Sequence, residues 1–451
     1  MSSRLRSLAR LARAAATVYP QGRVTKVVGL TIEAAGLTCP VGQLCRVTAG
    51  DHSLLCEAIG FRDDRILLMP LGRLDGVPPG APVFALGERL EVAVGEALLG
   101  QVLDGLGRPL AGASGPVQPL PTRYPVHRDA PSPLVRRPIV EALSVGVRAI
   151  DGLLTCGRGQ RLGIFAGSGV GKSTLLGMMA RHTAADVIVV ALIGERGREV
   201  REFLERDLGP RGLQRSVVVA ATSDEPPLVR IKAAYVATAI AEYFRDRGAD
   251  VLLLMDSVTR FAMAAREVGL AAGEPPTARG YTPSVFAELP RLLERAGRFG
   301  SGSITGFYTV LVEGDDLTEP ITDAVRGILD GHIVLDRDLA ARNHYPAIAV
   351  LDSVSRLMPH LVDGEHLAAA AHLRALLAAH RDGRDLVDIG AYRRGSNALL
   401  DEALDRWADI QRYLCQATDE ATTLEQARRE LVQLTDKSAP PSTGSATADV
   451  A

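Results

Sequence analysis

The stretch Ala166-Gly167-Ser168-Gly169-Val170-Gly171-Lys172-Ser173-Thr174 lies between an apolar run, Leu162 to Phe165, and an apparent helix, Thr174 to His182. A strand, a glycine-rich turn and a helix in this order are typical of a phosphate-binding loop. The backbone N–H groups of such a loop surround the β- and γ-phosphates, Lys172 neutralises phosphate charge, and the Ser173 hydroxyl coordinates Mg²⁺. Residues 167–174 therefore predict a site for ATP and Mg²⁺.

A carboxylate for the magnesium side of this site follows the apolar run Val251 to Met255. The run predicts a buried strand, and Asp256 comes directly after it. Open α/β sheets bind ligands at the carboxyl ends of their strands, where a carboxylate can hold a magnesium-bound water. We therefore predict Asp256 as the Walker B residue and, with Ser173, as a metal ligand. The alternative is an N-cap for the following helix.

Hydrolysis also needs a base that orients water, and Glu195 is the candidate. It follows the apolar run Val187 to Ile193 and lies in Gly194-Glu-Arg-Gly-Arg-Glu199. A carboxylate at the end of that strand could face the γ-phosphate. From spacing alone, a surface ion pair with Arg196 or Arg198 is an equal alternative.

The composition is that of a multidomain globular protein with almost no net charge. The 451 residues exceed one ordinary core, and 47% of them are hydrophobic and 23% charged. Lys and Arg number 51 against 53 Asp and Glu, for a net charge of −2, and only 4% of residues are aromatic. We therefore expect no nucleic-acid partner, because the chain has neither a basic field nor many stacking platforms.

Cysteine usage and hydropathy favour a cytoplasmic protein. The five cysteines are widely spaced and include no Cys-x-x-Cys pair, which predicts neither disulfides nor a zinc site. No run approaches the roughly 18 to 20 apolar residues of a transmembrane helix. The N-terminus lacks the apolar core of a signal peptide.

Residues 1–20 are predicted to form a basic amphipathic segment. Leucines 5, 8 and 11 fall on one helical stripe, whereas Arg6, Arg10 and Arg13 fall on the opposite side. Such a segment suits a protein partner or an anionic membrane surface. A solvated, frayed terminus is the alternative.

The rest of the chain divides by its pattern. Short apolar runs separated by Gly, Pro and Asp predict a small β-barrel over residues 21–95. Buried strands alternating with helical stretches predict a parallel α/β sheet covered by helices, and this domain is placed at residues 96–362. Ala- and Leu-rich helical pattern follows over 363–436, and residues 437–451 are predicted to be disordered. A Pro- and Gly-rich connector runs from Gly105 to Pro138.

Four strings resemble type III protein-export ATPases. They are Gly194 to Phe203, Leu254 to Met263, Gly273 through Phe286, and Val312-Glu-Gly-Asp-Asp316. This family is similar to the catalytic subunit of rotary F-type ATP synthases. The resemblance implies an α/β, RecA-like P-loop core with an N-terminal small β-barrel and a C-terminal helical domain, assembled as a homohexamer.

The resemblance also assigns roles within the site. Glu195 matches the family's catalytic glutamate, and Arg196 matches the adjacent arginine near the γ-phosphate. Tyr345 matches the aromatic that packs on adenine, and Arg356 matches the arginine finger that enters a neighbouring subunit's site. Family members usually carry Asp where Ala349 stands, so this chain departs from the family pattern in the segment just before the arginine finger, Arg356.

Three functions are compatible with such a core: an export ATPase, a non-catalytic nucleotide-binding ring subunit, and an RNA translocase. Glu195, Lys172, Asp256 and Arg356 together favour the ATPase, and the charge balance disfavours RNA. The resemblance further implies a stator-like regulatory partner at the N-terminus, export-gate and stalk components, export substrates and chaperones. It places the protein in the cytoplasm, peripheral to the inner face of the cytoplasmic membrane. A flagellar system is favoured over an injectisome.

Overall fold

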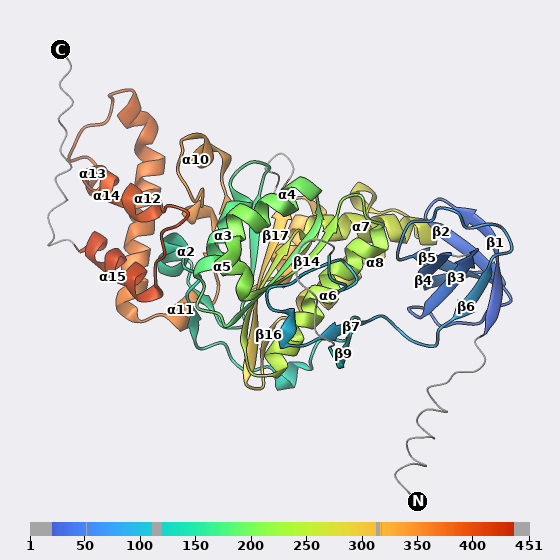
Figure 1. The fold of residues 1–451 in the computed structure, drawn as a ribbon. Coiled ribbons are helices and arrows are strands. Elements are labelled where there is room, and N and C mark those ends of the chain that lie inside the picture. Colours follow the sequence, from blue (N-terminus) through green and yellow to red (C-terminus); the bar gives the residue numbers. More distant parts are fainter. Residues whose placement is uncertain (1–19, 51, 111–119, 313–315, 317, 437–451) are drawn as a thin grey trace, which may run out of the picture.

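The computed structural model describes residues 20–50, 52–110, 120–312, 316 and 318–436. Figure 1 shows an elongated molecule in which a β-barrel, a central α/β domain and a C-terminal group of helices follow one another. The predicted amphipathic segment (apart from residue 20), the predicted disordered tail and residues 313–315 of the fourth family string lie outside the described residues.

The N-terminal barrel is closed by six antiparallel strands in the order β1-β2-β5-β4-β3-β6. Closure pairs every strand on both sides, so no sheet edge is left open. Inward side chains such as Ile32, Val47 and Leu68 form its core. The strands are β1 (Gln21–Val28), β2 (Thr31–Ala35), β3 (Leu44–Ala49), β4 (His52–Arg62), β5 (Arg65–Pro70) and β6 (Pro82–Ala85).

The central sheet has nine strands in the order β19-β18-β12-β17-β15-β13-β14-β8, with β16 added beside β17. All neighbouring pairs from β18 to β8 are parallel, as predicted, whereas β16 and β19 pair antiparallel. The strands are β8 (Val102–Leu103), β12 (Arg161–Ala166), β13 (Val187–Glu195), β14 (Ser216–Thr222), β15 (Asp250–Asp256), β16 (Gly297–Phe299), β17 (Gly302–Leu311), β18 (Gly331–Leu335) and β19 (Val354–Ser355).

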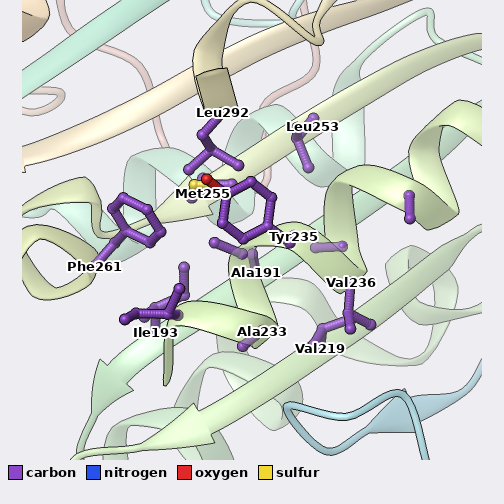
Figure 2. Close-up of a cluster of buried hydrophobic side chains, with 14 of the residues drawn as sticks. Ala191, Ile193, Val219, Ala233, Tyr235, Val236, Leu253, Met255, Phe261 and Leu292 are labelled. Atoms are coloured by element: carbon purple, nitrogen blue, oxygen red, sulfur yellow. The ribbon is translucent and has the colours of Figure 1, made fainter. Parts of the chain in front are cut away.

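Both faces of this sheet are buried, which explains its continuous apolar runs. Along β13, Val189, Ala191 and Ile193 pack into one cluster, whereas Ile188 and Val190 pack into the other. Figure 2 shows the first cluster, where Tyr235 and Phe261 cover the sheet. Because successive side chains of a strand point to opposite faces of the sheet, one apolar run contributes to both hydrophobic clusters.

Helices supply those two cores. The first contains side chains from α6, α7 and α8, and the second contains side chains from α2, α3 and the C-terminal helices. The helices before the C-terminal domain are α2 (Arg148–Leu153), α3 (Lys172–His182), α4 (Gly197–Glu202), the π-helical η3 (Phe203–Leu208), α5 (Gly209–Gln214), α6 (Pro227–Asp246), α7 (Val258–Ala272), α8 (Pro283–Leu293), α9 (Pro320–Ile328), α10 (Arg337–Ala341) and α11 (Met358–Leu361).

The C-terminal helices pack back onto the α/β domain. Asp363 caps α12 by accepting from the His366 amide, and the His366 ring lies 2.7 Å from the carbonyl oxygen of Gly152 in α2. Thr423 and Gln426 form a capping box on α15. The helices are α12 (Gly364–Asp388), α13 (Ala398–Asp405), α14 (Trp407–Leu414) and α15 (Leu424–Thr435). Among the described helices, none is both long and apolar enough to cross a membrane.

A buried ion pair joins the barrel to the α/β domain. Lys232 of α6 lies 2.7 Å from Glu57 of β4 and 2.6 Å from the ring of His127. Two small antiparallel pairs lie outside these two sheets, β7 (Glu91–Val94) with β9 (Thr122–Pro125) and β10 (Ala142–Leu143) with β11 (Cys156–Gly157). The domain boundaries given above stay a prediction.

Candidate functional site

The phosphate-binding loop connects β12 to α3 at the carboxyl end of the sheet. Gly169 and Gly171 have φ of 81° and 87°, a left-handed backbone that only glycine adopts without strain. Gly171 is the N-cap of α3 and has no side chain to cover the first helical amides. Ser168, Gly169 and Ser173 are exposed. The helix therefore begins with free N–H groups and the positive end of its dipole facing outward, as a phosphate requires.

Three predicted site residues meet beside this loop. Lys172 places Nζ 2.5 Å from Oδ1 of Asp256 and 3.7 Å from Oε1 of Glu195. Glu195 is the last residue of β13, Asp256 is the last residue of β15, and Lys172 begins α3 directly after the loop that follows β12. In the sheet, β17 lies between β12 and β15. The predicted lysine, base and Walker B carboxylate therefore form one cluster.

The environment of Glu195 keeps its carboxyl ready to accept a proton near neutral pH. Burial and the charge of Asp256 raise its pKa to about 7, and Lys172 partly opposes this rise. Within the described residues, its Oε1 is buried and has no hydrogen-bond partner. A general base works best when its pKa lies near the working pH. The electrostatics thus suit Glu195 to take a proton from water.

Tyr345 lies against the phosphate-binding loop. A Cβ placed on Gly171 would stand 3.3 Å from Cε1 of Tyr345, so the ring is in contact with the loop backbone. The side chain is partly exposed, and the Tyr345 carbonyl accepts from the amide of Gln416 in the C-terminal domain. The ring is therefore held where a base attached to loop-bound phosphates could stack on it.

Arg356 lies at the other end of the sheet. Its amide donates to the carbonyl of Asp330 at 3.1 Å, and the amide of Asp330 donates to Arg161, the first residue of β12. The six residues of β12 separate this point from the loop, a span of roughly 20 Å at about 3.3 Å per residue. The exposed Arg356 guanidinium makes no hydrogen bond or ion pair with the described residues. It cannot reach the loop of its own chain.

Comparisons with known proteins identify the family. Residues 146–355 match the nucleotide-binding domain of the ATP synthase alpha/beta family, and residues 24–87 match its beta-barrel domain. Residues 362–433 match the T3SS EscN ATPase C-terminal domain. A flagellum-specific ATP synthase of Bacillus subtilis is 55% identical over 419 residues, covering 92% of this chain and 95% of the relative. The chain belongs to the type III protein-export ATPase family.

Relatives from both kinds of export system are similar to this export ATPase. A type 3 secretion system ATPase of Xanthomonas euvesicatoria is 55% identical over 417 residues, covering 92% of this chain and 94% of the relative. The assembled ATPase EscN of enteropathogenic E. coli matches with a TM-score of 0.87 and 46% identity, over 92% of this chain and all of EscN. EscN in complex with its central stalk EscO matches with a TM-score of 0.85, 47% identity and the same coverage. The predicted fold class, the ATPase activity and the nucleotide substrate are confirmed.

One predicted site residue of the export ATPase points away from the cluster. The Arg196 side chain is 81% exposed and lies 3.6 Å from Glu199 in the same helical turn. Its role near the γ-phosphate stays a prediction. The alternative expectation, an ion pair of Glu195 with Arg196 or Arg198, is not met among the described residues, because Arg196 pairs with Glu199, Arg198 pairs with Glu202, and Glu195 lies beside Lys172.

Two further residues belong to the cluster and were not predicted. Thr309 of β17 donates its hydroxyl to Oδ1 of Asp256 at 2.7 Å. Arg260 of α7 packs its aliphatic chain against Gly194, and its buried Nε has no hydrogen-bond partner among the described residues. Two sequence signals could have found Arg260: it lies four residues after Asp256, and it belongs to the family string Leu254 to Met263. Thr309 had none, because it lies inside an apolar run.

The donor set fits a magnesium ion. Mg²⁺ is usually held by one or two protein oxygens together with phosphate oxygens and waters. Ser173 is exposed at the start of α3, and both polar contacts of Asp256 noted above fall on Oδ1. The hydroxyl of Ser173 and the carboxylate of Asp256 would hold the ion, which would neutralise charge on the phosphates.

Proposed function

We propose that this ATPase works with Mg²⁺ as a homohexameric ring and couples ATP hydrolysis to flagellar type III export. In that role it releases or unfolds substrates and their chaperones at the export gate. The observation that carries the proposal is the cluster of Lys172, Glu195 and Asp256 on a chain that also carries Arg356 at the amino end of the strands, where its side chain has no partner among the described residues. One chain type thus supplies every group that the reaction needs.

Each group has a separate part in hydrolysis. The loop amides and Lys172 hold the β- and γ-phosphates, while the Tyr345 ring orients the adenine of ATP. Glu195 orients a water for in-line attack and takes its proton. Arg356 of the neighbouring subunit stabilises the charge on the transferring phosphoryl group.

The separation between the carboxyl and amino ends of the strands supports a head-to-tail ring. The loop lies at the carboxyl end of β12, and Arg356 lies at its amino end. A contact that joins these two unlike ends is heterologous, and repeated heterologous contacts close into a ring when the rotation between neighbouring subunits allows closure. EscN, which is similar over 92% of this chain, has been solved in an assembled form.

The remaining partners follow from the family. The EscN–EscO complex supports a central stalk partner for this chain. We further propose a stator-like regulatory partner for residues 1–20, and contacts with export-gate components, substrates and chaperones. In this proposal the protein is cytoplasmic, peripheral to the membrane, and able to contact anionic lipid through the basic N-terminal segment.

An injectisome is the second candidate system. The Xanthomonas relative and the Bacillus relative are equally identical to this chain. Both candidates use the same site chemistry, so only the exported proteins differ.

The test is complementation in the organism that carries this chain. A strain without the gene should lose flagellar filament protein from the medium and lose motility, and the wild-type gene should restore both. Glu195→Gln should restore neither while its protein accumulates normally. Loss of secreted effectors with intact motility would establish the injectisome instead, and unchanged export of both would defeat the proposal.

A further inference from the structure

Three large apolar side chains lie exposed on one short segment of the α/β domain. Leu134 is 95% exposed, Val135 is 57% exposed and Val140 is 61% exposed. Single exposed apolar residues are ordinary, but three of them within seven residues of one ordered segment mark a candidate contact surface. We call Leu134, Val135 and Val140 the apolar strip.

The backbone around the apolar strip is held firmly against β16. The amide of Arg137 donates to the carbonyl of Arg298 at 3.0 Å, and Arg136 forms an isolated bridge with Phe299. Arg298 also lies 2.6 Å from Glu141. The strip is therefore presented outward by a fixed scaffold.

A chain of ion pairs connects the strip to the backbone of Arg356. Arg136 lies 2.7 Å from Glu294, which also pairs with Arg161. Arg161 pairs with Asp330 at 3.2 Å, and the carbonyl of Asp330 accepts from the amide of Arg356. All these contacts lie at the amino ends of β12 and β18.

Apolar contacts also place the segment that carries the apolar strip at the amino ends of these strands. Ile139, inside the segment, and Leu361 of α11 lie 2.3 and 3.1 Å from the position of a Cβ on Gly157. Val354 of the edge strand β19, two residues before Arg356, is also exposed. In Figure 1, β16 and α11 lie at the end of the sheet away from α4. The strip and Arg356 thus share one edge of the domain.

We infer that a second copy of this chain covers the apolar strip in the ring. The inference rests on the proposed ring: if Arg356 serves a neighbour's nucleotide, then the carboxyl edge of that neighbour must approach the edge that carries the strip. Burying the strip there stabilises the assembly and brings Arg356 to the site.

The test compares assembly with nucleotide binding in the full chain. Leu134→Asp combined with Val140→Asp should raise the protein concentration for half-assembly at least ten-fold, measured by mass photometry with Mg²⁺ and a non-hydrolysable ATP analogue. The analogue's Kd for the unassembled chain should stay unchanged, because both side chains lie outside the site. Ile389→Ser, which alters a side chain 75% exposed at the end of α12, is the matched control and should change neither value.

A crosslink identifies the occupant. A benzoylphenylalanine at position 135 should give crosslinked dimers whose second peptide comes from the carboxyl edge of another copy, around residues 168–173 or 195–208. Crosslinks to residues 1–19, crosslinks only within one chain, or unchanged assembly of the Asp variant would overturn the inference and leave the ring proposal standing. A wild-type chain that neither assembles nor hydrolyses ATP would defeat both.

Discussion

Lys172 contacts Asp256 directly, with 2.5 Å between Nζ and Oδ1. The ammonium that is expected to neutralise phosphate charge therefore also neutralises the carboxylate expected at the metal. Glu195 lies 3.7 Å from the same ammonium. Removing this one charge would leave two carboxylates facing each other in a buried place.

Lys172→Ala and Glu195→Gln are expected to fail differently. Without Lys172, the phosphates lose their cation and the pKa of Glu195 rises further, so tight nucleotide binding should be lost. Glu195→Gln keeps the shape of the site and should bind ATP while turnover falls by roughly 10²–10⁴-fold. Calorimetric binding and phosphate release distinguish the two variants. Equal loss of binding in both would contradict this division of roles.

The pH dependence of hydrolysis should reflect Glu195. Its pKa is raised to about 7, so the carboxylate that accepts the proton becomes populated as the pH rises through 7. We expect kcat/KM to increase roughly ten-fold per pH unit below that value and to level off above it. The measurement needs saturating Mg²⁺, so that ATP stays as its magnesium complex. A flat profile from pH 5.5 to 8 would exclude Glu195 as the titrating base.

Arg356→Ala should bind ATP and assemble, but hydrolyse it slowly. Arginine fingers contribute roughly 10³–10⁵-fold in related phosphoryl-transfer systems. Because the group acts in a neighbour's site, mixing Arg356→Ala with Glu195→Gln should restore some hydrolysis at interfaces that combine the two intact residues. Wild-type activity should also rise steeply with protein concentration. Mixed rings that form without any activity would show that the assignment is wrong.

Tyr345→Ala should weaken nucleotide binding with little change in kcat. Stacking of a base on an aromatic ring is worth roughly 1–3 kcal/mol, or about 5- to 150-fold in Kd. Tyr345→Phe is the matched control, since it retains the ring and should bind like the wild type. Fluorescent-nucleotide titration measures both. A large loss in Tyr345→Phe would point to the hydroxyl instead.

A buried ion pair in the α/β domain should be costly to break. Arg295 and Glu242 form two hydrogen bonds of 2.9 and 2.7 Å, and both side chains are excluded from water. Glu242→Ala leaves an unpaired buried guanidinium at a cost of about 3–5 kcal/mol. For a domain of this size that lowers the Tm by on the order of 10 °C. Glu242→Leu with Arg295→Met should lose less, and scanning calorimetry compares the two.

Much of the fold could be predicted from the sequence because its signals are local. The parallel strands are buried on both faces, so each appears as a continuous apolar run, and glycines mark the phosphate loop between β12 and α3. In the barrel, apolar runs mark β1, β4, β5 and β6 but not β2 and β3. Those two are short and carry polar residues such as Glu33 and Arg46, so they form no apolar run.

By itself, the sequence determined the phosphate-binding loop and the expected chemistry of Lys172, Ser173 and Asp256, and it left Glu195 open between a catalytic base and a surface ion pair. Local spacing could not bring Glu195 to Lys172, because that depends on the order of β12, β17, β15 and β13 in the sheet. Nor could it place Thr309 on Asp256, or Arg260 against Gly194. Family resemblance alone suggested Tyr345 and Arg356. Only the tertiary structure decided that Tyr345 contacts the loop while Arg356 lies a full strand length away, since both positions depend on how distant segments pack.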